Sequence, residues 1–305
     1  MYMVKLRQLL LDGLLFAAAL MISCGTTGSA ALQPKTMNYD FVNVLSFGLP
    51  GMNEVEVSTI LYHVDNAGNE LYMDIYKPPA ADRNGLLPVL VQAMGFPDDV
   101  IEEWIGTPLK EYPAVRSWGR LAASVGMASV AYQTTDANDF KRVMAFLDSS
   151  AEKLGIDRER IGVLSVSANP PTAIAYLLDE NGDDLSFAVF SFALMTSPDG
   201  YLQNENDALA DEQGWYNPPP VGRIPANVPI YLGIAGLDYI EFSPDSAFHF
   251  AELAEAAGAK VTVDYFEEGL HSYDHEQHGE RSTGMIIDQL NFMADGFGID
   301  IGLDG

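Results

Sequence analysis

A short segment of the sequence places a serine where a nucleophile could work. Residues 161–165 form an apolar run, a tight turn follows around Ser167, and an apolar helical stretch begins at Ala168. A serine at a sharp turn from strand to helix stands above the edge of the sheet, and the helix start behind it favours negative charge. Such turns usually carry glycine two residues before and after the serine, whereas this sequence has Ser165 and Asn169. Asparagine tolerates unusual backbone angles, so we expect that the turn forms and that glycine at position 169 would be tolerated.

Short apolar runs and longer amphipathic stretches alternate along the chain and must position this serine. The sequence predicts strands at 55–62, 71–76, 88–94, 127–132, 161–165, 187–192, 229–235 and 261–266, and helices at 113–125, 136–154, 168–178, 244–257 and 282–294. Strands that alternate with helices indicate crossover connections and parallel pairing. We therefore predict the α/β class, with a mostly parallel central sheet of about eight strands flanked by helices.

The stretch 118–178 resembles the α/β-hydrolase superfamily and, within it, dienelactone-hydrolase-like serine esterases. Three features match in chain order. Residues 120–122 and Gly126 precede the predicted strand 127–132, the long predicted helix 136–154 follows, and the run 156–169 comes after it. The resemblance implies an α/β-hydrolase fold for residues 37–305. It also implies cleavage of carboxylic esters through an acyl-enzyme intermediate.

The same resemblance implies the chain order serine, acid, histidine. Asp238 and His271 each follow directly after a predicted strand, in the loops where the superfamily carries its acid and its histidine. A neutral histidine accepts the serine proton, and a carboxylate orients it. We therefore predict Ser167 as nucleophile, His271 as base and Asp238 as acid. An alternative is that Asp238 only stabilises a turn and that Asp245 is the acid.

An oxyanion hole needs two backbone N–H groups aimed at the developing negative charge. Ala168, directly after the nucleophile, is the expected first donor. The second is expected in the turn after strand 88–94, where this chain has Gly95, Phe96 and Pro97. Proline has no N–H, so we predict Phe96 as the second donor.

Apolar side chains near these positions are predicted to form the substrate walls. Met94 and Tyr239 flank the predicted catalytic loops, and Trp215 lies in residues 196–228, which break the strand–helix rhythm and are rich in turn formers. A long irregular segment in a compact domain is often functional. We interpret 196–228 as a small cap over the site, with a plain surface excursion as the alternative.

The sequence gives no reason to expect a cofactor. It has no glycine-rich dinucleotide fingerprint. His271, His275 and His278 have a spacing that binds metal on a helix, but acidic and turn residues interrupt them. We therefore predict no metal, and a histidine metal site remains the alternative.

The first residues have the form of a secretory leader. Lys5 and Arg7 precede the short apolar run 14–23, and Cys24 follows it. This end resembles a bacterial lipobox, in which the cysteine is acylated. We expect a signal peptide over the first 23 residues, a lipidated tether at 24–36, and anchoring at the bacterial envelope. The alternative is an ordinary signal peptide with a chance cysteine.

The charge balance excludes one class of function. Lys and Arg number 16 against 43 Asp and Glu, for a net charge of −27. Binding to nucleic acid needs clustered cations, so no nucleic-acid partner is expected. The expected partner is a small-molecule or glycan-linked ester. Two other functions stay open: an exopeptidase that uses Glu102, Glu103 or residues 204–212 to bind a charged terminus, and a non-catalytic binding scaffold.

Overall fold

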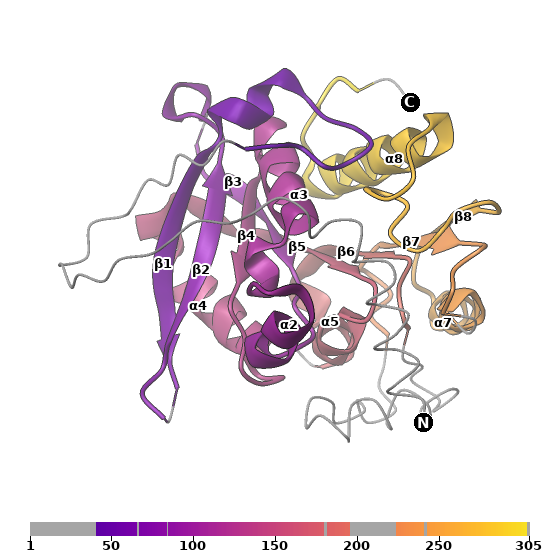
Figure 1. Cartoon of the computed structure of the whole chain (residues 1–305), viewed down its shortest axis with the longest axis horizontal. Helices are drawn as coiled ribbons and strands as arrows, with labels where there is room; N and C mark the ends of the chain where they lie inside the picture. Colours follow the sequence, from indigo (N-terminus) through magenta and orange to yellow (C-terminus); the bar gives the residue numbers. More distant parts are fainter. Residues whose placement is uncertain are drawn as a thin grey trace.

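A computed structural model describes residues 41–303, except positions 66, 84, 180–181, 196–223 and 241–242. The predicted leader and tether, with Cys24, and most of the predicted cap, with Trp215, lie outside the described residues. The chain order of the elements is visible in Figure 1.

The strands are β1 (Glu56–Val64), β2 (Glu70–Lys77), β3 (Leu87–Gln92), β4 (Ala128–Tyr132), β5 (Ile156–Val166), β6 (Leu185–Ser191), β7 (Ile230–Ala235) and β8 (Val261–Phe266). The α-helices are α2 (Asp98–Ile105), α3 (Pro113–Ser124), α4 (Asp139–Leu154), α5 (Pro170–Leu177), α7 (Ser243–Ala256) and α8 (Glu280–Phe297). Short 3-10 turns are η1 (Pro50–Glu54), η2 (Ala80–Asp82), η3 (Leu109–Glu111) and η4 (Gly182–Asp184).

Within the described residues the strands form one eight-stranded sheet in the order β1-β2-β4-β3-β5-β6-β7-β8. Strand β2 is antiparallel to both of its neighbours, and the strands from β4 to β8 across the sheet pair in parallel. The predicted mostly parallel sheet of about eight strands is confirmed. Parallel strands end at the same edge of a sheet, so the loops after β3, β5, β7 and β8 converge there.

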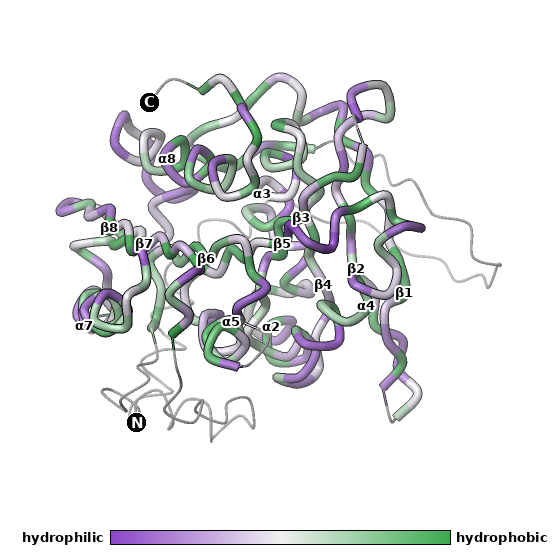
Figure 2. Tube along the Cα trace, turned by 180° about the vertical axis from the view of Figure 1, so that it is seen from behind, coloured by the Kyte–Doolittle hydropathy of each residue, from purple (hydrophilic) through white to green (hydrophobic). Residues whose placement is uncertain are grey.

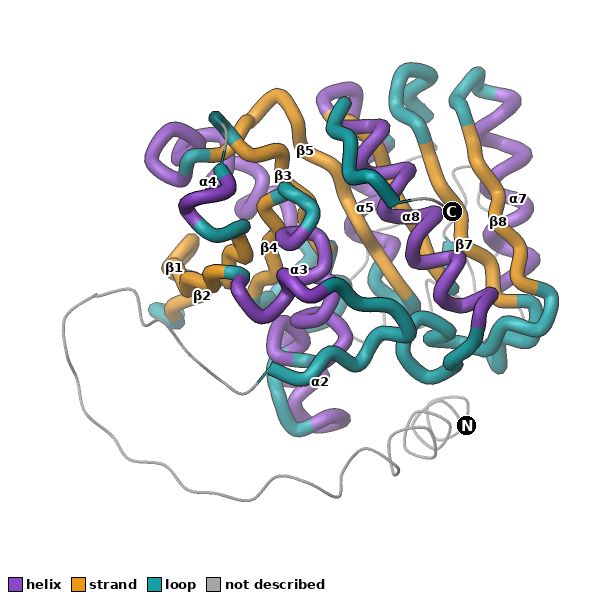
Figure 3. The backbone as a smooth tube through the Cα atoms, turned by 90° about the horizontal axis from the view of Figure 1, so that it is seen from above, coloured by secondary structure: helices purple, strands orange, loops and turns teal. Residues whose placement is uncertain are grey.

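Helices cover both faces of the sheet (Figure 3). The side chains of a strand point alternately to the two faces. On β5, Val163 belongs to the apolar cluster that includes residues of α4, α5 and α7. Its neighbour Leu164 belongs to the cluster that includes residues of α3 and α8. Central strands buried on both faces explain the continuous apolar runs of the sequence, and they are coloured mainly hydrophobic in Figure 2.

Two elements differ from the sequence prediction by more than three residues. Strand β5 begins at Ile156 rather than at residue 161, because the charged residues 157–160, of which Arg158 and Glu159 are exposed, hide the apolar pattern of a strand. Helix α2 was not predicted, since it has only eight residues and starts directly after Pro97. It ends at Gly106, whose φ of 79° is left-handed. None of the described helices is both long and apolar enough to cross a lipid bilayer.

Candidate active site

Ser167 lies in a strained turn between β5 and α5. Its φ is 57°, which is uncommon for a residue with a side chain. Such a conformation costs about 1–3 kcal/mol and persists only where its surroundings enforce it. Here the Ser167 amide donates to the carbonyl of Ser191 at 3.2 Å, and the Leu194 amide donates to the Ser167 carbonyl at 2.7 Å. The end of β6 therefore holds the turn in place.

Asn169 ties this turn to the loop after β3. Its Oδ1 accepts a hydrogen bond from the Gly95 amide at 2.7 Å, and its Nδ2 donates to the Val166 carbonyl at 3.0 Å. The two loops touch so closely that a Cβ on Gly95 would lie 2.4 Å from the Cα of Asn169. Position 169 is thus a link between two loops, and the expectation that glycine would be tolerated there no longer follows.

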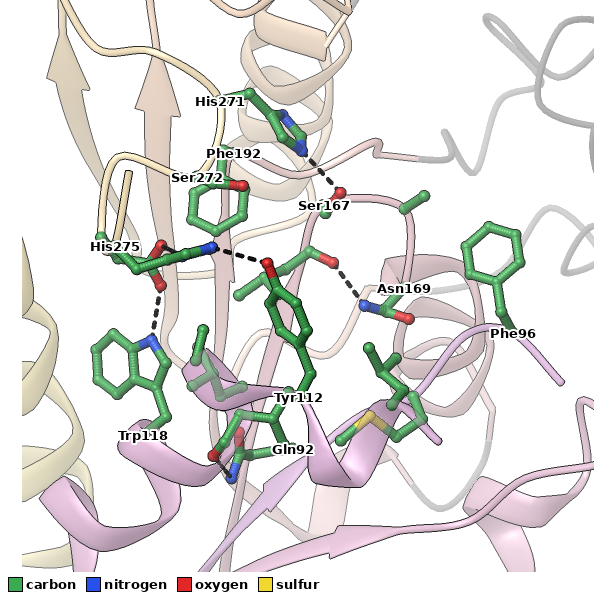
Figure 4. A pocket seen from close by; sticks show the side chains of 18 of the residues that line it. Gln92, Phe96, Tyr112, Trp118, Ser167, Asn169, Phe192, His271, Ser272 and His275 are labelled. Atoms are coloured by element: carbon green, nitrogen blue, oxygen red, sulfur yellow. Dashed lines mark hydrogen bonds and ion pairs between the residues drawn. The ribbon is translucent and has the colours of Figure 1, made fainter. Parts of the chain in front are cut away.

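Ser167, His271 and Asp238 form one chain of contacts. The Oγ of Ser167 lies 2.8 Å from Nε2 of His271, and Nδ1 of His271 lies 2.9 Å from Oδ2 of Asp238. Figure 4 shows His271 pointing toward Ser167 across the pocket. The other oxygen of Asp238 accepts the Ile240 amide at 2.8 Å, so this carboxylate also stabilises its own turn. Asp245, the alternative acid, lies instead in the first turn of α7.

Two aromatic rings fix the orientation of the His271 imidazole. The Phe192 ring lies edge-on at 5.1 Å between centroids, and the Tyr239 ring lies at 4.8 Å. His271 is 3% exposed, and the Asp238 side chain is fully buried. A buried His–Asp pair interacts more strongly than it would in water.

A buried polar network supports the loop that carries His271. Ser191 Oγ donates to Gln289 Oε1 at 2.8 Å, and Gln289 Nε2 donates to the Tyr273 hydroxyl at 3.2 Å. Gly233 on β7 leaves room for that hydroxyl, since a Cβ there would lie 2.3 Å from it. The His271 loop is therefore anchored to β6, β7 and α8.

The predicted oxyanion donors lie beside the serine. Ala168, Phe96 and Ser167 line the same pocket. Among the described residues, none accepts a hydrogen bond from the Ala168 amide. The Gly95 amide is committed to Asn169, which leaves Phe96 as the next amide of that loop.

The pocket in front of Ser167 has a volume of about 210 Å³ and mostly apolar walls. Met94 and Tyr239, both predicted from the sequence, line it. Several wall residues were not predicted, and they come from the end of β3, from α2 and the segment after it, from α3, and from the His271 loop: Gln92, Ile101, Ile105, Leu109, Tyr112, Trp118, Asp274 and His275. The four-residue spacing of Ile101 and Ile105 before Gly106 is a helical signal that could have revealed the α2 wall.

Asp98 holds the start of α2 against the rest of the site. Its carboxylate accepts the Thr134 amide at 3.2 Å and the Leu109 amide at 3.4 Å, and its own amide donates to the Thr134 carbonyl at 2.8 Å. Burial outweighs these hydrogen bonds and raises the pKa of Asp98 to about 7. Asp98 therefore links α2 and the segment after it to the loop after β4.

The structure bears on the alternatives from the sequence. Within the described residues, no three His, Cys, Asp or Glu side chains are grouped as metal ligands. His275 contacts Asp274 and the Tyr112 hydroxyl. Glu102 and Glu103 are exposed on α2 and do not line the pocket. Residues 204–212 lie outside the described residues.

Solved structures of esterases share this architecture. A bacterial heroin esterase matches with a TM-score of 0.61 and 18% identity, covering 81% of this chain and 86% of that one. Brefeldin A esterase, a bacterial homologue of human hormone sensitive lipase, gives 0.59 and 19%, covering 84% and 81%. A thermostable esterase from Pseudomonas putida ECU1011 gives 0.60 and 16%, covering 84% and 86%.

No family model matches the sequence, and no curated protein does. At these low identities the structural likeness shows the fold alone. This chain has the α/β-hydrolase fold.

Proposed function

We propose that this chain is a serine esterase that cleaves carboxylic esters through an acyl-enzyme intermediate. One observation carries the proposal. The hydroxyl of Ser167, in a strained turn, lies 2.8 Å from His271, which lies 2.9 Å from the buried Asp238, all beside an apolar pocket. Esterases among the solved structures with this fold support it.

The contacts define the proton path of the acylation step. The Asp238 carboxylate accepts a hydrogen bond from the Nδ1–H of His271, which leaves Nε2 unprotonated and able to take the proton of the Ser167 hydroxyl. Ser167 Oγ then attacks the ester carbonyl carbon, and the carbonyl oxygen becomes an oxyanion. The amides of Ala168 and Phe96 are the proposed donors to that oxygen.

The departure of the alcohol completes acylation, and water then removes the acyl group. The imidazolium of His271 gives its proton to the departing alcohol, which breaks the ester bond and leaves an acyl group on Ser167. A water molecule then loses a proton to Nε2 of His271 and attacks the acyl carbonyl. The acid is released, and Ser167 regains its proton. No cofactor takes part in this scheme.

The substrate proposed for this site is an uncharged ester, either of a small molecule or attached to a glycan. Mostly apolar walls favour uncharged groups, and a chain of net charge −27 repels anions. A closer relation to dienelactone-hydrolase-like esterases stays part of the proposal and has only the sequence stretch 118–178 in its favour.

Labelling with a fluorophosphonate probe tests the proposal directly. Mass spectrometry of the labelled protein should find a covalent adduct on Ser167, and Ser167→Ala should abolish both labelling and ester hydrolysis. Ser165→Ala is the matched control, because Ser165 is 1% exposed and its hydroxyl has no hydrogen-bond partner among the described residues. That variant should label and fold normally.

Other outcomes would replace this proposal. A folded protein that does not react with the probe is the binding scaffold. A protein that reacts but hydrolyses aminoacyl amides faster than the matching esters is the exopeptidase. An adduct on Ser165 would remove Ser167 from the assigned role.

We also propose that the chain is exported and tethered to the bacterial envelope by a lipid on Cys24. The support is the sequence alone: a charged start, a short apolar run, and a cysteine at its end. The small and polar residues at 25–36 suit a flexible tether between lipid and enzyme.

A further inference from the structure

A second Asp–His pair lies in the same pocket and takes no part in the proposed reaction. Nδ1 of His275 lies 2.7 Å from Oδ1 of Asp274, and Nε2 of His275 lies 3.3 Å from the hydroxyl of Tyr112. The other oxygen of Asp274 accepts the indole N–H of Trp118 at 2.7 Å. Figure 4 shows Tyr112, His275 and Trp118 linked in this way, with Ser167 in the same pocket.

Backbone hydrogen bonds and ring packing hold Asp274, His275 and Tyr112 in place. Asp274 is 2% exposed, and its carbonyl accepts the Ser46 amide at 2.7 Å. The His275 amide donates to the Ser272 carbonyl at 3.0 Å. The Tyr112 and His275 rings meet edge to face, with centroids 5.8 Å apart and an angle of 78°.

The protonation of His275 sets what the Tyr112 hydroxyl can do. In either state, the Nδ1–H of His275 donates a hydrogen bond to the Asp274 carboxylate. If Nε2 carries no proton, it accepts a hydrogen bond from the Tyr112 O–H, and Tyr112 offers the pocket only lone pairs. If Nε2 carries a proton, it donates to the Tyr112 oxygen, and the Tyr112 O–H is free to donate into the pocket.

The surrounding charges favour the protonated form. Burial alone would lower the pKa of His275, but the contacts with Asp274 and the nearby Glu276 outweigh it and raise that pKa above the ordinary value. Tyr239, after β7, is a further titratable group that lines the pocket with Tyr112 and interacts with it electrostatically. Burial and the charges of Glu276 and Asp274 raise the pKa of Tyr112 to about 12, so its hydroxyl keeps its proton near neutrality.

We propose that Tyr112 is a specificity-determining residue that donates a hydrogen bond to an uncharged oxygen of the substrate. His275 and Asp274 are the positioning residues that direct its hydroxyl. The inference rests on the proposed esterase function, and it narrows the substrate to esters that carry a second oxygen, such as a keto or ether oxygen, away from the scissile bond. A carboxylate is disfavoured by Asp274 and Glu276, both of which line the pocket.

The apolar surroundings make this one donor selective. Leu109, Ala114 and Val115 line the pocket along the same stretch of chain as Tyr112. A methylene group placed against the hydroxyl would leave a desolvated donor without a partner, whereas an oxygen would satisfy it. The pocket therefore discriminates between two esters when one has an oxygen and the other a methylene group at the position that meets the Tyr112 hydroxyl.

A competition assay with paired esters tests the proposal. The substrates are a series of p-nitrophenyl esters in which a keto group or an ether oxygen is placed at one acyl position after another. Each of them is compared with the ester that has a methylene group at the same position. The series is then repeated with the oxygen in the alcohol part of acetate esters. Wild type should prefer at least one oxygen-bearing ester by about threefold to tenfold in kcat/KM. Tyr112→Phe should abolish that preference, while Tyr62→Phe, which removes a phenol hydroxyl outside the pocket, should keep it.

The pH dependence of the same ratio gives a readout that needs no altered Tyr112. Both esters share the Ser167 chemistry, so its own pH profile cancels in the ratio. The preference should be full below the pKa of His275 and should fall as pH rises through it, because neutral His275 then accepts the hydrogen bond of the Tyr112 O–H, which no longer points to the substrate. His275→Gln should make the ratio independent of pH.

The possible results separate this proposal from the esterase proposal. Hydrolysis of both esters of every pair at equal rates in wild type, or a preference that Tyr112→Phe leaves intact, would overturn the role of Tyr112 and keep the esterase. No hydrolysis of any ester by a well-folded protein would overturn the esterase proposal itself.

Discussion

Replacing Asn169 with glycine tests how the nucleophile turn and the oxyanion loop are joined. The change removes the acceptor of the Gly95 amide and the donor to the Val166 carbonyl. Leaving the buried Gly95 amide unsatisfied costs about 1–3 kcal/mol. The extra freedom of glycine in the unfolded chain adds up to about 1 kcal/mol. We therefore expect Asn169→Gly to lower the free energy of unfolding by about 1–4 kcal/mol.

The effect on turnover follows from the same contact. Without the anchor of Gly95, the adjoining Phe96 amide loses its fixed position relative to Ser167. Complete loss of one oxyanion donor costs about a hundredfold to a thousandfold in kcat, so partial displacement should cost about tenfold to a hundredfold. KM should change little, because the apolar walls of α2 and α3 remain.

Urea unfolding and steady-state hydrolysis of a p-nitrophenyl ester measure the two effects. Asn227→Gly is the matched control, since Asn227 is exposed and its side chain donates a hydrogen bond to the Asp183 carbonyl, away from the pocket. It should change stability only slightly and leave kcat unchanged. If Asn169→Gly keeps kcat within about twofold of wild type, the link between the two loops does not position the oxyanion donor, and the electrostatic argument for this contact fails.

Three further outcomes follow from the structure. Gly95→Ala, whose Cβ would lie 2.4 Å from the Cα of Asn169, should lower kcat by about a hundredfold or more in esterase assays while circular dichroism shows a folded protein. Asp98 has a pKa raised from 3.8 to about 7, so the folded state holds this proton more tightly and the free energy of unfolding falls as pH rises through that window. Between pH 4 and 8, Asp98 should lower the free energy of unfolding of the wild type by up to about 4 kcal/mol, and Asp98→Asn should remove this fall. Urea titrations at several pH values measure it, and the same pH dependence in both proteins would contradict the raised pKa. Cys24→Ser should shift the protein from the membrane fraction to the soluble fraction without loss of activity, and sedimentation with membranes after a high-salt wash would exclude the lipid anchor.

The sequence predicted the parts of the site that depend on strand ends. Asp238 and His271 could be located because each follows a strand, and parallel strands deliver their loops to one edge of the sheet. The contact between Gly95 and Asn169 joins residues 74 positions apart, and the one between Tyr112 and His275 spans 163. Neither leaves a periodic pattern in the sequence, so only the folded chain reveals it.

Other differences have local physical causes. Helix α2 escaped prediction because two acidic residues after Pro97 resemble a turn as much as a helix start. The link from Asn169 to the next loop could not be predicted, because its hydrogen bond with the Gly95 amide forms only when β3 and β5 lie side by side. Sequence patterns report burial and backbone preference, and side-chain hydrogen bonds between distant loops are outside what they encode.

One loop carries both His271 and His275, and for the proposed esterase this has a consequence for how its sequence could diverge. A substitution that moves the loop would alter turnover and substrate choice together, so selection on either property is constrained by the other. The α2 wall with Ile101 and Ile105 belongs to a separate segment, attached through Asp98. Mutational paths toward new substrates should therefore accumulate in α2, where side chains can be exchanged without disturbing the histidine loop.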